Sequence, residues 1–224
     1  MTRAYELFLQ GGPVMWPLLG LSVLTLTRAI ERAGFWVRLL GREDEIVSLV
    51  LDAARYDWNK AVAIAQQARS LPIGRFLLAP LQLQNPNPET FHLAMEAAAD
   101  REFIQMRKGN QFFEAVVGLS PLLGLLGTVI GLIVTFAELD IGNIAQTNTS
   151  QALAGISAAL LTTAAGTMVA ILALGFFRIF VSLQTQQMDY FFTVGNELEL
   201  IYRQIWYDRI CASSSSSGET GSEL

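Results

Sequence analysis

Residues 115–137 read AVVGLSPLLGLLGTVIGLIVTFA, a run of 23 residues without a charged side chain that is bounded by Glu114 and Glu138. A second uncharged run covers residues 152–177. A helix rises about 1.5 Å per residue and the hydrocarbon core of a bilayer is about 30 Å thick, so either run is long enough to cross it. The two runs therefore predict a pair of membrane spans.

The composition of the chain is that of an integral membrane protein, with 52% hydrophobic and 16% charged residues among 224. The net charge of -5 comes without a stripe of Lys and Arg, which argues against nucleic acid as a partner. We expect an all-α membrane protein that lies in a lipid bilayer.

A third apolar run, residues 14–27, is short by itself, but its helical pattern continues past Arg28. No small-residue cleavage site follows it, so we interpret it as a span and not as a signal peptide. The expected architecture has three transmembrane helices, at residues 13–40, 112–137 and 152–183.

The distribution of basic residues predicts the orientation of these spans. Residues 38–108 contain nine Lys and Arg, whereas residues 138–151 contain none. Because Lys and Arg near a span stay on the cytoplasmic side, we expect a cytoplasmic domain at 41–111, a periplasmic loop at 138–151, and a periplasmic N-terminal segment at 1–12. The C-terminus is then cytoplasmic.

The cytoplasmic segments are expected to be helical. Breaks separate helices at 43–56, 59–69 and 73–84, and a fourth helix begins at Pro88 with Asn87 as its cap. This fourth helix is predicted to continue without a stop into the second span. A further cytoplasmic helix is expected at 184–210, followed by a disordered Ser-rich tail at 211–224.

The chain has one cysteine, Cys211, and one histidine, His92. A single cysteine excludes a disulfide framework within the chain. No group of ligand-type residues surrounds His92 in the sequence, so a surface or packing role is favoured over a metal site. We expect neither a metal nor a cofactor.

One face of the second span combines hydroxyl groups with glycines. At 100° per residue the three hydroxyl residues Ser120, Thr128 and Thr135 fall within about 80° of one another. The glycines beside them permit close approach of another helix: Gly124, Gly127 and Gly131.

The third span has two adjacent ridges of small residues. One ridge is Ala154, Ala158, Thr162, Gly166 and Ala170, and the other is Gly155, Ala159, Thr163 and Thr167. Helices in lipid associate through such small surfaces. We therefore expect tight helix packing at Gly155, Ala158, Ala159 and Gly166.

The threonines have two interpretations. Each hydroxyl can simply bond a carbonyl of its own helix, or the hydroxyls can line a hydrated path or contact a polar group of another helix. Neither 115–137 nor 152–177 contains a titratable side chain. If the protein conducts protons, another polypeptide must supply the carboxylate.

Three segments resemble the MotA/TolQ/ExbB proton-channel family, and its ExbB and TolQ branch most closely: GGPVMWPLL at 11–19, SPLLGLLGTVIGLIVTF at 120–136 and GISAALLTTAAGTMVAI at 155–171. The resemblance extends over most of the chain, to about residue 205. It implies a subunit of a bacterial inner-membrane motor in which a homopentamer surrounds a single-span partner of the ExbD or TolR type.

In this resemblance the partner's membrane aspartate carries protons, and a TonB-like or TolA-like protein receives the work. Thr128 and Thr163 match the channel-facing threonines of the family, and Ser120, Thr135 and Thr167 are further candidates for the proton pathway. The sequence departs from the family at Ala158, where many relatives have glutamate, and at Leu172, where a proline is common.

The primary hypothesis is thus an ExbB-like proton-channel subunit that energises TonB-dependent outer-membrane transport. A TolQ-like subunit for envelope maintenance, another motor of the same family, and a membrane scaffold that does not conduct are the alternatives. An enzyme is disfavoured because the spans contain no nucleophile and base pair.

Overall fold

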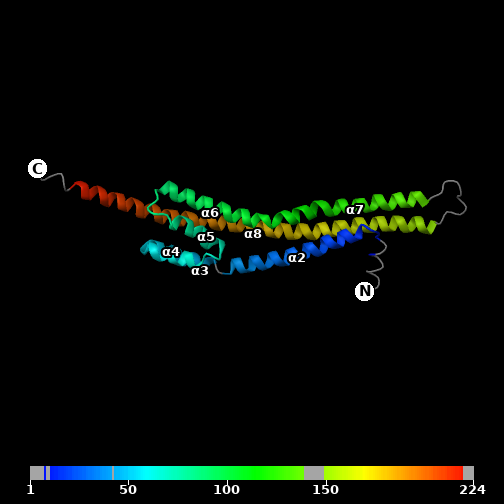
Figure 1. Ribbon diagram of the computed structural model, residues 1–224, viewed down its shortest axis with the longest axis horizontal. Helices are drawn as coiled ribbons and strands as arrows, with labels where there is room; N and C mark the ends of the chain where they lie inside the picture. Colours follow the sequence, from blue (N-terminus) through cyan, green and yellow to red (C-terminus); the bar gives the residue numbers. More distant parts are fainter. Residues whose placement is uncertain (1–7, 9–10, 42, 139–148, 219–224) are drawn as a thin grey trace. The chain divides into compact units, whose positions relative to one another are not determined.

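The computed structural model describes residues 8, 11–41, 43–138 and 149–218, and its regular elements within those ranges are helices (Figure 1). They are α2 (Met15–Leu40), α3 (Glu43–Tyr56), α4 (Trp58–Gln67), α5 (Pro72–Leu81), α6 (Pro88–Lys108), α7 (Asn110–Glu138) and α8 (Thr149–Gly218). The expected all-α class is confirmed. The expected segments 1–12 and 138–151 lie mostly outside the described residues.

The chain divides into two compact units. The first consists of Met1–Ala33 and Lys108–Val181, and the second of Gly34–Arg107 and Ser182–Leu224. The first unit contains α7, most of α2 and the first part of α8, whereas the second contains α3 to α6 and the remainder of α8.

Two helical stretches are long and apolar enough to cross a membrane, Pro88–Ala137 and Leu153–Cys211, with mean hydropathies of 2.2 and 2.0 in their most apolar segments. α2 is a helix of 26 residues but is not one of these two candidates. Charged residues at Arg28, Glu31 and Arg32 interrupt its apolar sequence. A third span therefore stays a prediction.

The predicted unbroken helix from Pro88 into the second span is wrong in one detail, because a turn at Gly109 separates α6 from α7. A Cβ atom at Gly109 would lie 2.7 Å from the guanidinium carbon of Arg32. A larger residue at this position would require the Arg32 side chain to move, and glycine also favours a helix break. The sequence places a glycine there but does not reveal the packed arginine.

Most other helix boundaries agree with expectation to within a few residues, but the helices expected separately at 152–183 and 184–210 are one continuous helix, α8. The Asn87 side chain caps α6, since the amide of Thr90 donates to its Oδ1 at 2.7 Å. The tail was predicted to be disordered, but α8 continues through Gly218. A helix that already extends over many residues adds each further residue without a new nucleation cost, which outweighs the weak preference of serine.

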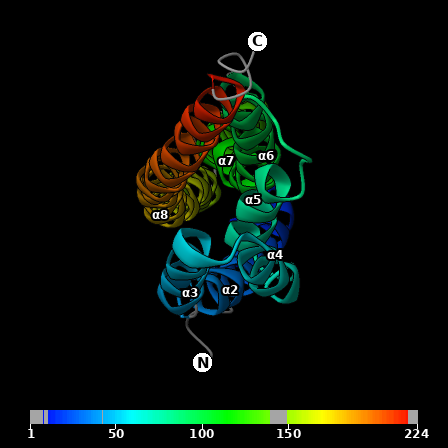
Figure 2. The ribbon, with the colours of Figure 1, turned by 90° about the vertical axis from the view of Figure 1, so that its left-hand side faces the viewer.

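Apolar side chains of α3 to α6 and of residues 182–218 form the core of the second unit. Figure 2 shows α3, α4 and α5 grouped together. The rings of Phe91 and Tyr202 stack with centroids 4.2 Å apart, and Phe191 contacts Phe76 and Phe103. These aromatic contacts join residues of α5 and α6 to those of α8, and burial of large rings supplies the main stabilisation.

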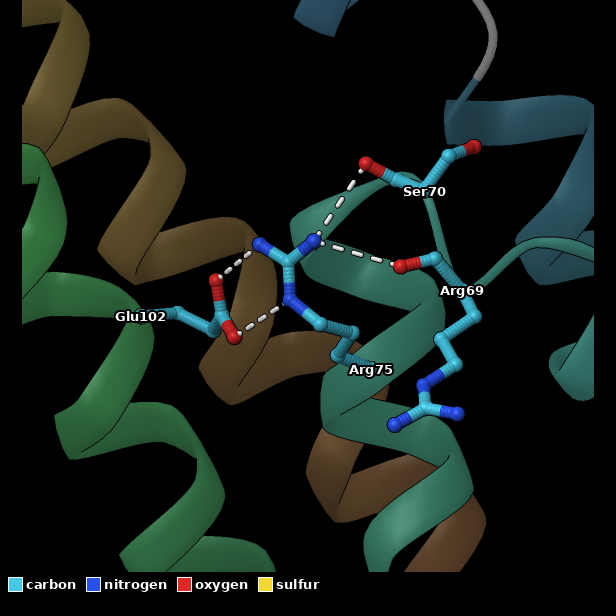
Figure 3. A network of polar contacts seen from close by, with 4 residues as sticks. All are labelled: Arg69, Ser70, Arg75 and Glu102. Atoms are coloured by element: carbon cyan, nitrogen blue, oxygen red, sulfur yellow. Dashed lines mark hydrogen bonds and ion pairs between the residues drawn. The ribbon is translucent and has the colours of Figure 1, made fainter.

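Figure 3 shows a buried ion pair in the same unit. Arg75 donates from Nε to Glu102 Oε1 at 2.8 Å and from Nη2 to Oε2 at 2.5 Å, and its Nη1 donates to the carbonyls of Arg69 and Ser70. The Glu102 side chain is only 7% exposed. The two-pronged contact satisfies a carboxylate that would otherwise be costly to bury.

We expect Glu102→Gln to lower the free energy of unfolding by about 2 kcal/mol, because the half-buried Arg75 loses its charged partner. Glu197→Gln is the matched control, since it removes a carboxylate that pairs with Arg55 at 2.9 Å where both side chains are about half exposed. Such a pair contributes less than about 1 kcal/mol. Thermal unfolding of the purified protein measures both. Equal effects would contradict the assigned role of the Arg75 pair.

Glu43, in the first turn of α3, is a buried acid of the second unit, 3% exposed. Burial raises its pKa to about 7, a hydrogen bond from Gln187 opposes the rise, and the neighbouring Asp44 adds to it. Asp44 accepts a hydrogen bond from Tyr190 at 2.7 Å. In the folded protein Glu43 is therefore mainly neutral below pH ~7 and mainly ionised above it.

This burial makes stability depend on pH. The pKa of Glu43 is about 7 in the folded protein and 4.5 ordinarily. Between these two pH values the folded form therefore keeps a proton that the unfolded form has released. The free energy of unfolding should then fall by about 3 kcal/mol as the pH rises through this range. Glu43→Gln should remove this part of the pH dependence and raise the melting temperature at pH ~8 by on the order of 5 °C.

Glu45→Gln is the control, because Glu45 is an exposed acid of the same helical turn. Melting temperatures of the three proteins between pH ~4.5 and ~8 test the assignment. If the parent and Glu43→Gln proteins lost the same stability over this range, the buried carboxyl would not be its source.

Candidate functional site

The α7 and α8 helices of the first unit are in backbone contact. A Cβ atom at Gly166 would lie 2.6 Å from the carbonyl oxygen of Ser120 and 3.0 Å from Cα of Gly124. A Cβ atom at Gly124 would lie 3.0 Å from the carbonyl oxygen of Thr162. Two helices can approach this closely only where both lack side chains, so these positions set the spacing of the pair.

The same contact continues along the helices. Gly127 lies against the side chain of Thr162, and Gly155 lies against the hydroxyl of Thr135. A Cβ atom at Gly131 would lie 3.0 Å from Cβ of Ala159. The structure thus brings together six of the seven residues expected to pack helices, and the seventh, Ala158, is half-buried.

One hydroxyl joins the two helices directly. Thr163 donates from Oγ1 to the carbonyl oxygen of Gly124 at 3.1 Å. The acceptor is available because α8 approaches the glycine closely enough for a short side chain to reach it. A hydroxyl that donates in this way still has oxygen lone pairs that can accept a hydrogen bond.

Most of the other candidate hydroxyls bond within their own helix. Thr128 donates to Leu125 O at 2.6 Å, Thr135 to Gly131 O at 2.8 Å, and Thr167 to the carbonyls of Thr163 and Ala164 at 2.9 Å. Each of these threonines thus bonds a carbonyl of its own helix, and any contact with another polypeptide has to use the remaining oxygen lone pairs.

The predicted hydroxyl stripe of the second span does not face one environment. Ser120 is 0% exposed and Thr135 is 3% exposed, since both lie in the contact with α8. Thr128 is half-buried, and on α8 Thr163 is half-buried while Thr167 is exposed. The structure therefore separates a buried set of hydroxyls from a more accessible set.

The buried set has two features that periodicity alone did not single out. The Ser120 hydroxyl has no hydrogen-bond partner among the described residues. Thr162, which the sequence analysis placed on a ridge but not in the site, is 1% exposed and packs directly on Gly127. Thr162 lies four residues before Gly166 on the same ridge, and this spacing could have assigned it to the contact from the sequence.

The contact surface consists of aliphatic, hydroxyl and glycine groups, and neither residues 115–137 nor residues 152–177 include a side chain that titrates near neutral pH. Among the described residues no group of three His, Cys, Asp or Glu could hold a metal ion. Hydroxyls can hydrogen-bond a proton carrier but cannot act as one. By itself this surface can bind, orient or hydrate a carboxyl group.

His92 lies in the second unit. Its Nδ1 is 2.8 Å from Oε2 of Glu199, and Arg203 donates to Oε1 of the same carboxylate at 2.9 Å. Burial disfavours the ionised carboxylate, but the contacts with His92 and Arg203 outweigh it and lower the pKa of Glu199. The interaction fits the packing role expected for this histidine.

Comparison with protein families gives one match, in which residues 68–192 fit the MotA/TolQ/ExbB proton channel family. The matched segment includes all of α5, α6 and α7, and the first part of α8. It therefore contains the whole described contact between α7 and α8.

Individual relatives extend the similarity over more of the chain. A Synechocystis sp. protein designated biopolymer transport protein ExbB-like 1 is 60% identical over 207 residues, which is 92% of this chain and 82% of the relative. A second protein of that organism, designated ExbB-like 3, is 38% identical over 194 residues, or 87% of this chain and 92% of the relative. The biopolymer transport protein ExbB of Salmonella typhimurium is 36% identical over 90 residues, or 40% of this chain.

Proposed function

The chain belongs to the MotA/TolQ/ExbB proton channel family, and from this membership we propose that it is an ExbB-like proton-channel subunit of a motor driven by the proton motive force. The family consists of channel subunits of membrane complexes and not of enzymes. In the proposed role the chain works with an ExbD-type partner to energise TonB-dependent transport at the outer membrane.

The observation that supports this proposal best is the contact between α7 and α8. It holds an accessible set of hydroxyls at fixed positions, with Thr163 bonded to the backbone of Gly124 at 3.1 Å. It offers no carboxylate of its own. A surface that can hydrogen-bond a carboxyl group but lacks one suits a subunit whose proton carrier belongs to another chain.

In the proposed mechanism the partner's aspartate takes up a proton and becomes neutral, so that it can move through an apolar environment at lower cost. Thr128 and Thr163 form hydrogen bonds with that carboxyl group, either as donors to it or as acceptors from it. Ser120, Thr135 and Thr167 extend the polar surface that hydrates it. The small residues of α7 and α8 fix the spacing between these hydroxyls.

The proposed topology has three spans in the bacterial inner membrane, with the N-terminus in the periplasm and the C-terminus in the cytoplasm. Residues 41–111 and 184–210 then lie in the cytoplasm, in keeping with the basic residues of 38–108. A homopentamer around the partner is the proposed assembly, and a TonB-like protein is the recipient of the work.

Reconstitution tests the proposal. The chain should co-purify with a single-span partner, and liposomes that contain both should take up protons down an imposed gradient. Replacement of the partner's membrane aspartate by asparagine should abolish the flux. Flux that survived this replacement would contradict a mechanism in which the carboxylate comes from the partner.

A scaffold that does not conduct is the second candidate, and Ala158 is the observation that favours it. Relatives that use a glutamate at this position have an internal carboxylate, whereas alanine cannot exchange a proton. The same experiment separates the two functions, because a scaffold would co-purify with the partner without proton flux.

A further inference from the structure

The second unit contains a cavity of about 150 Å³ between α6 and residues 191–196 of α8. Its inner surface is formed mainly by Phe76, Met95, Phe103, Phe191 and Gly195. The first four of these side chains are each at most 5% exposed, so they hold the cavity walls in place. An apolar pocket of this size can accept a group as large as benzene.

Gly195 packs closely against the wall of the cavity. A Cβ atom there would lie 3.0 Å from Cζ of Phe76 and 3.2 Å from Sδ of Met95. A larger residue at this position of α8 would therefore press on these two side chains and displace the wall. Open apolar volume of this kind is unfavourable unless something occupies it.

The exposed side chains that line the cavity include two carboxylates and His92, whose Nδ1 lies 2.8 Å from Oε2 of Glu199. The carboxylates are those of Glu96 and Asp100, which line its mouth one helical turn apart on α6, and both are exposed. Within the part of the chain that the structure describes, neither carboxylate forms a hydrogen bond or an ion pair. Phe192, at the same mouth, exposes 62% of its surface although it is a large apolar residue. The mouth thus combines an aromatic surface with two unpaired carboxylates.

We propose that this cavity binds an apolar or aromatic side chain flanked by Lys or Arg, from the cytoplasmic segment of the single-span partner. The apolar side chain fills the cavity, and the flanking cations pair with Glu96 and Asp100. Cations also interact favourably with the exposed ring of Phe192. Charge complementarity with the two carboxylates selects a basic segment over an acidic one.

This inference rests on the proposed function, because it requires a single-span partner with a segment on the cytoplasmic side. Such a segment is expected to be basic, since Lys and Arg beside a span are retained in the cytoplasm. A second copy of this chain is the competing occupant.

Photocrosslinking in the intact complex identifies the occupant. A benzophenone amino acid replaces Phe192 in the full chain, which is co-expressed with the partner and irradiated in the membrane. We expect a crosslink to the basic cytoplasmic segment of the partner. A crosslink to a second copy of this chain, or to lipid alone, would overturn the proposal.

Competition with peptides tests the chemistry of the cavity. Acetyl-Arg-Phe-Arg-amide should suppress the crosslink, whereas acetyl-Glu-Phe-Glu-amide and acetyl-Arg-Ala-Arg-amide should not. Suppression that weakens at high salt is expected, because exposed charge pairs are screened. Equal competition by all three peptides would rule out the stated recognition.

Two matched pairs of variants separate the cavity from general effects on folding. Ala99→Leu places side-chain volume in the cavity, and Ala97→Leu, on the same helix but exposed and not part of the lining, is its control. Only the first should reduce the crosslink yield, by about tenfold. Glu96→Gln with Asp100→Asn should reduce it about fivefold, whereas Asp52→Asn with Asp208→Asn should not.

Co-purification and proton flux show which proposal has failed. If the partner co-purifies and protons flow but Phe192 gives no crosslink to it, the cavity proposal alone is wrong. If no partner co-purifies and no flux occurs, the proposed function is wrong, and the cavity proposal that rests on it fails with it.

Discussion

Replacing Gly166 by leucine is expected to prevent α7 and α8 from packing together, so that little folded protein is recovered from the membrane. A Cβ atom at this position would already lie 2.6 Å from the carbonyl oxygen of Ser120 and 3.1 Å from the backbone nitrogen of Gly124. These are backbone atoms of the facing helix, so no rotamer change can relieve the clash. The helices would have to separate along the whole contact.

Gly175→Leu is the matched control on the same helix, since a Cβ atom at Gly175 would meet nothing within 4 Å. Alanine adds only a Cβ atom, so it is a milder substitution than leucine at the same two positions. Gly166→Ala should lower stability by about 3 kcal/mol, whereas Gly175→Ala should raise it by about 0.5 kcal/mol because alanine favours the helix. Yield and thermal unfolding in detergent give the comparison.

The two alanine variants thus have opposite expected signs, although both glycines lie within α8. Equal losses for Gly166→Ala and Gly175→Ala would mean that helix propensity or insertion matters and that the close contact does not. Gly118 on α7 is a second open position, with nothing within 4 Å of its Cβ site. If Gly118→Ala raised the stability or left it unchanged, the result would support the assignment of the tight surface to Gly124 and its neighbours.

The helices of this fold could be predicted from the sequence because their signals are local. Asn87 and Pro88 begin α6 as expected, and the uncharged runs mark α7 and the first part of α8. Helical periodicity also determines which small residues share a face, as in the ridges of the third expected span. What periodicity does not determine is the partner of each face.

That limit explains the outcome for the hydroxyl stripe. Ser120, Thr128 and Thr135 fall on one side of an ideal helix, yet Ser120 and Thr135 are buried against α8 while Thr128 is only half-buried. The direction of approach of the second helix decides this difference. It depends on which glycines meet across the contact, and that is a tertiary property.

Long-range polar contacts were equally inaccessible from the sequence. Glu102 and Arg75 are 27 positions apart, and Glu43 and Gln187 are 144 positions apart. Nothing in their local sequence distinguishes them from exposed polar residues on amphipathic helices. Their burial follows from the packing of α3, α5, α6 and α8 within the second unit, which sets the pKa of Glu43 and the pairing of Glu102.

The second large effect is expected on proton flux. Thr128→Val and Thr163→Val each replace a hydroxyl by a methyl group of nearly the same size, so the helices should keep their shape. If these hydroxyls contact the partner's aspartate, the double variant should lose at least about tenfold in flux, since removal of one hydrogen bond to a charged group corresponds to about 1.5 kcal/mol or more.

The two single variants should differ in a way that the structure specifies. Thr163 bonds across to Gly124, whereas Thr128 bonds only Leu125 of its own helix. Thr163→Val therefore removes an interhelical bond and should also lower the melting temperature slightly. Thr128→Val should reduce flux without that loss of stability. Flux and melting temperature measured on the same samples therefore distinguish a hydroxyl that holds the two helices in place from one that contacts the partner's aspartate.

Thr27→Val is the matched control, because Thr27 is an exposed threonine of α2 that bonds the carbonyl of Val23 at 2.8 Å. It removes a hydroxyl of the same kind without touching α7 or the contact described above, and its flux should equal that of the parent. Unchanged flux in the double variant, with the partner still bound, would mean that the carboxyl group is solvated by water or by other residues. The accessible hydroxyls of α7 and α8 would then serve helix packing alone.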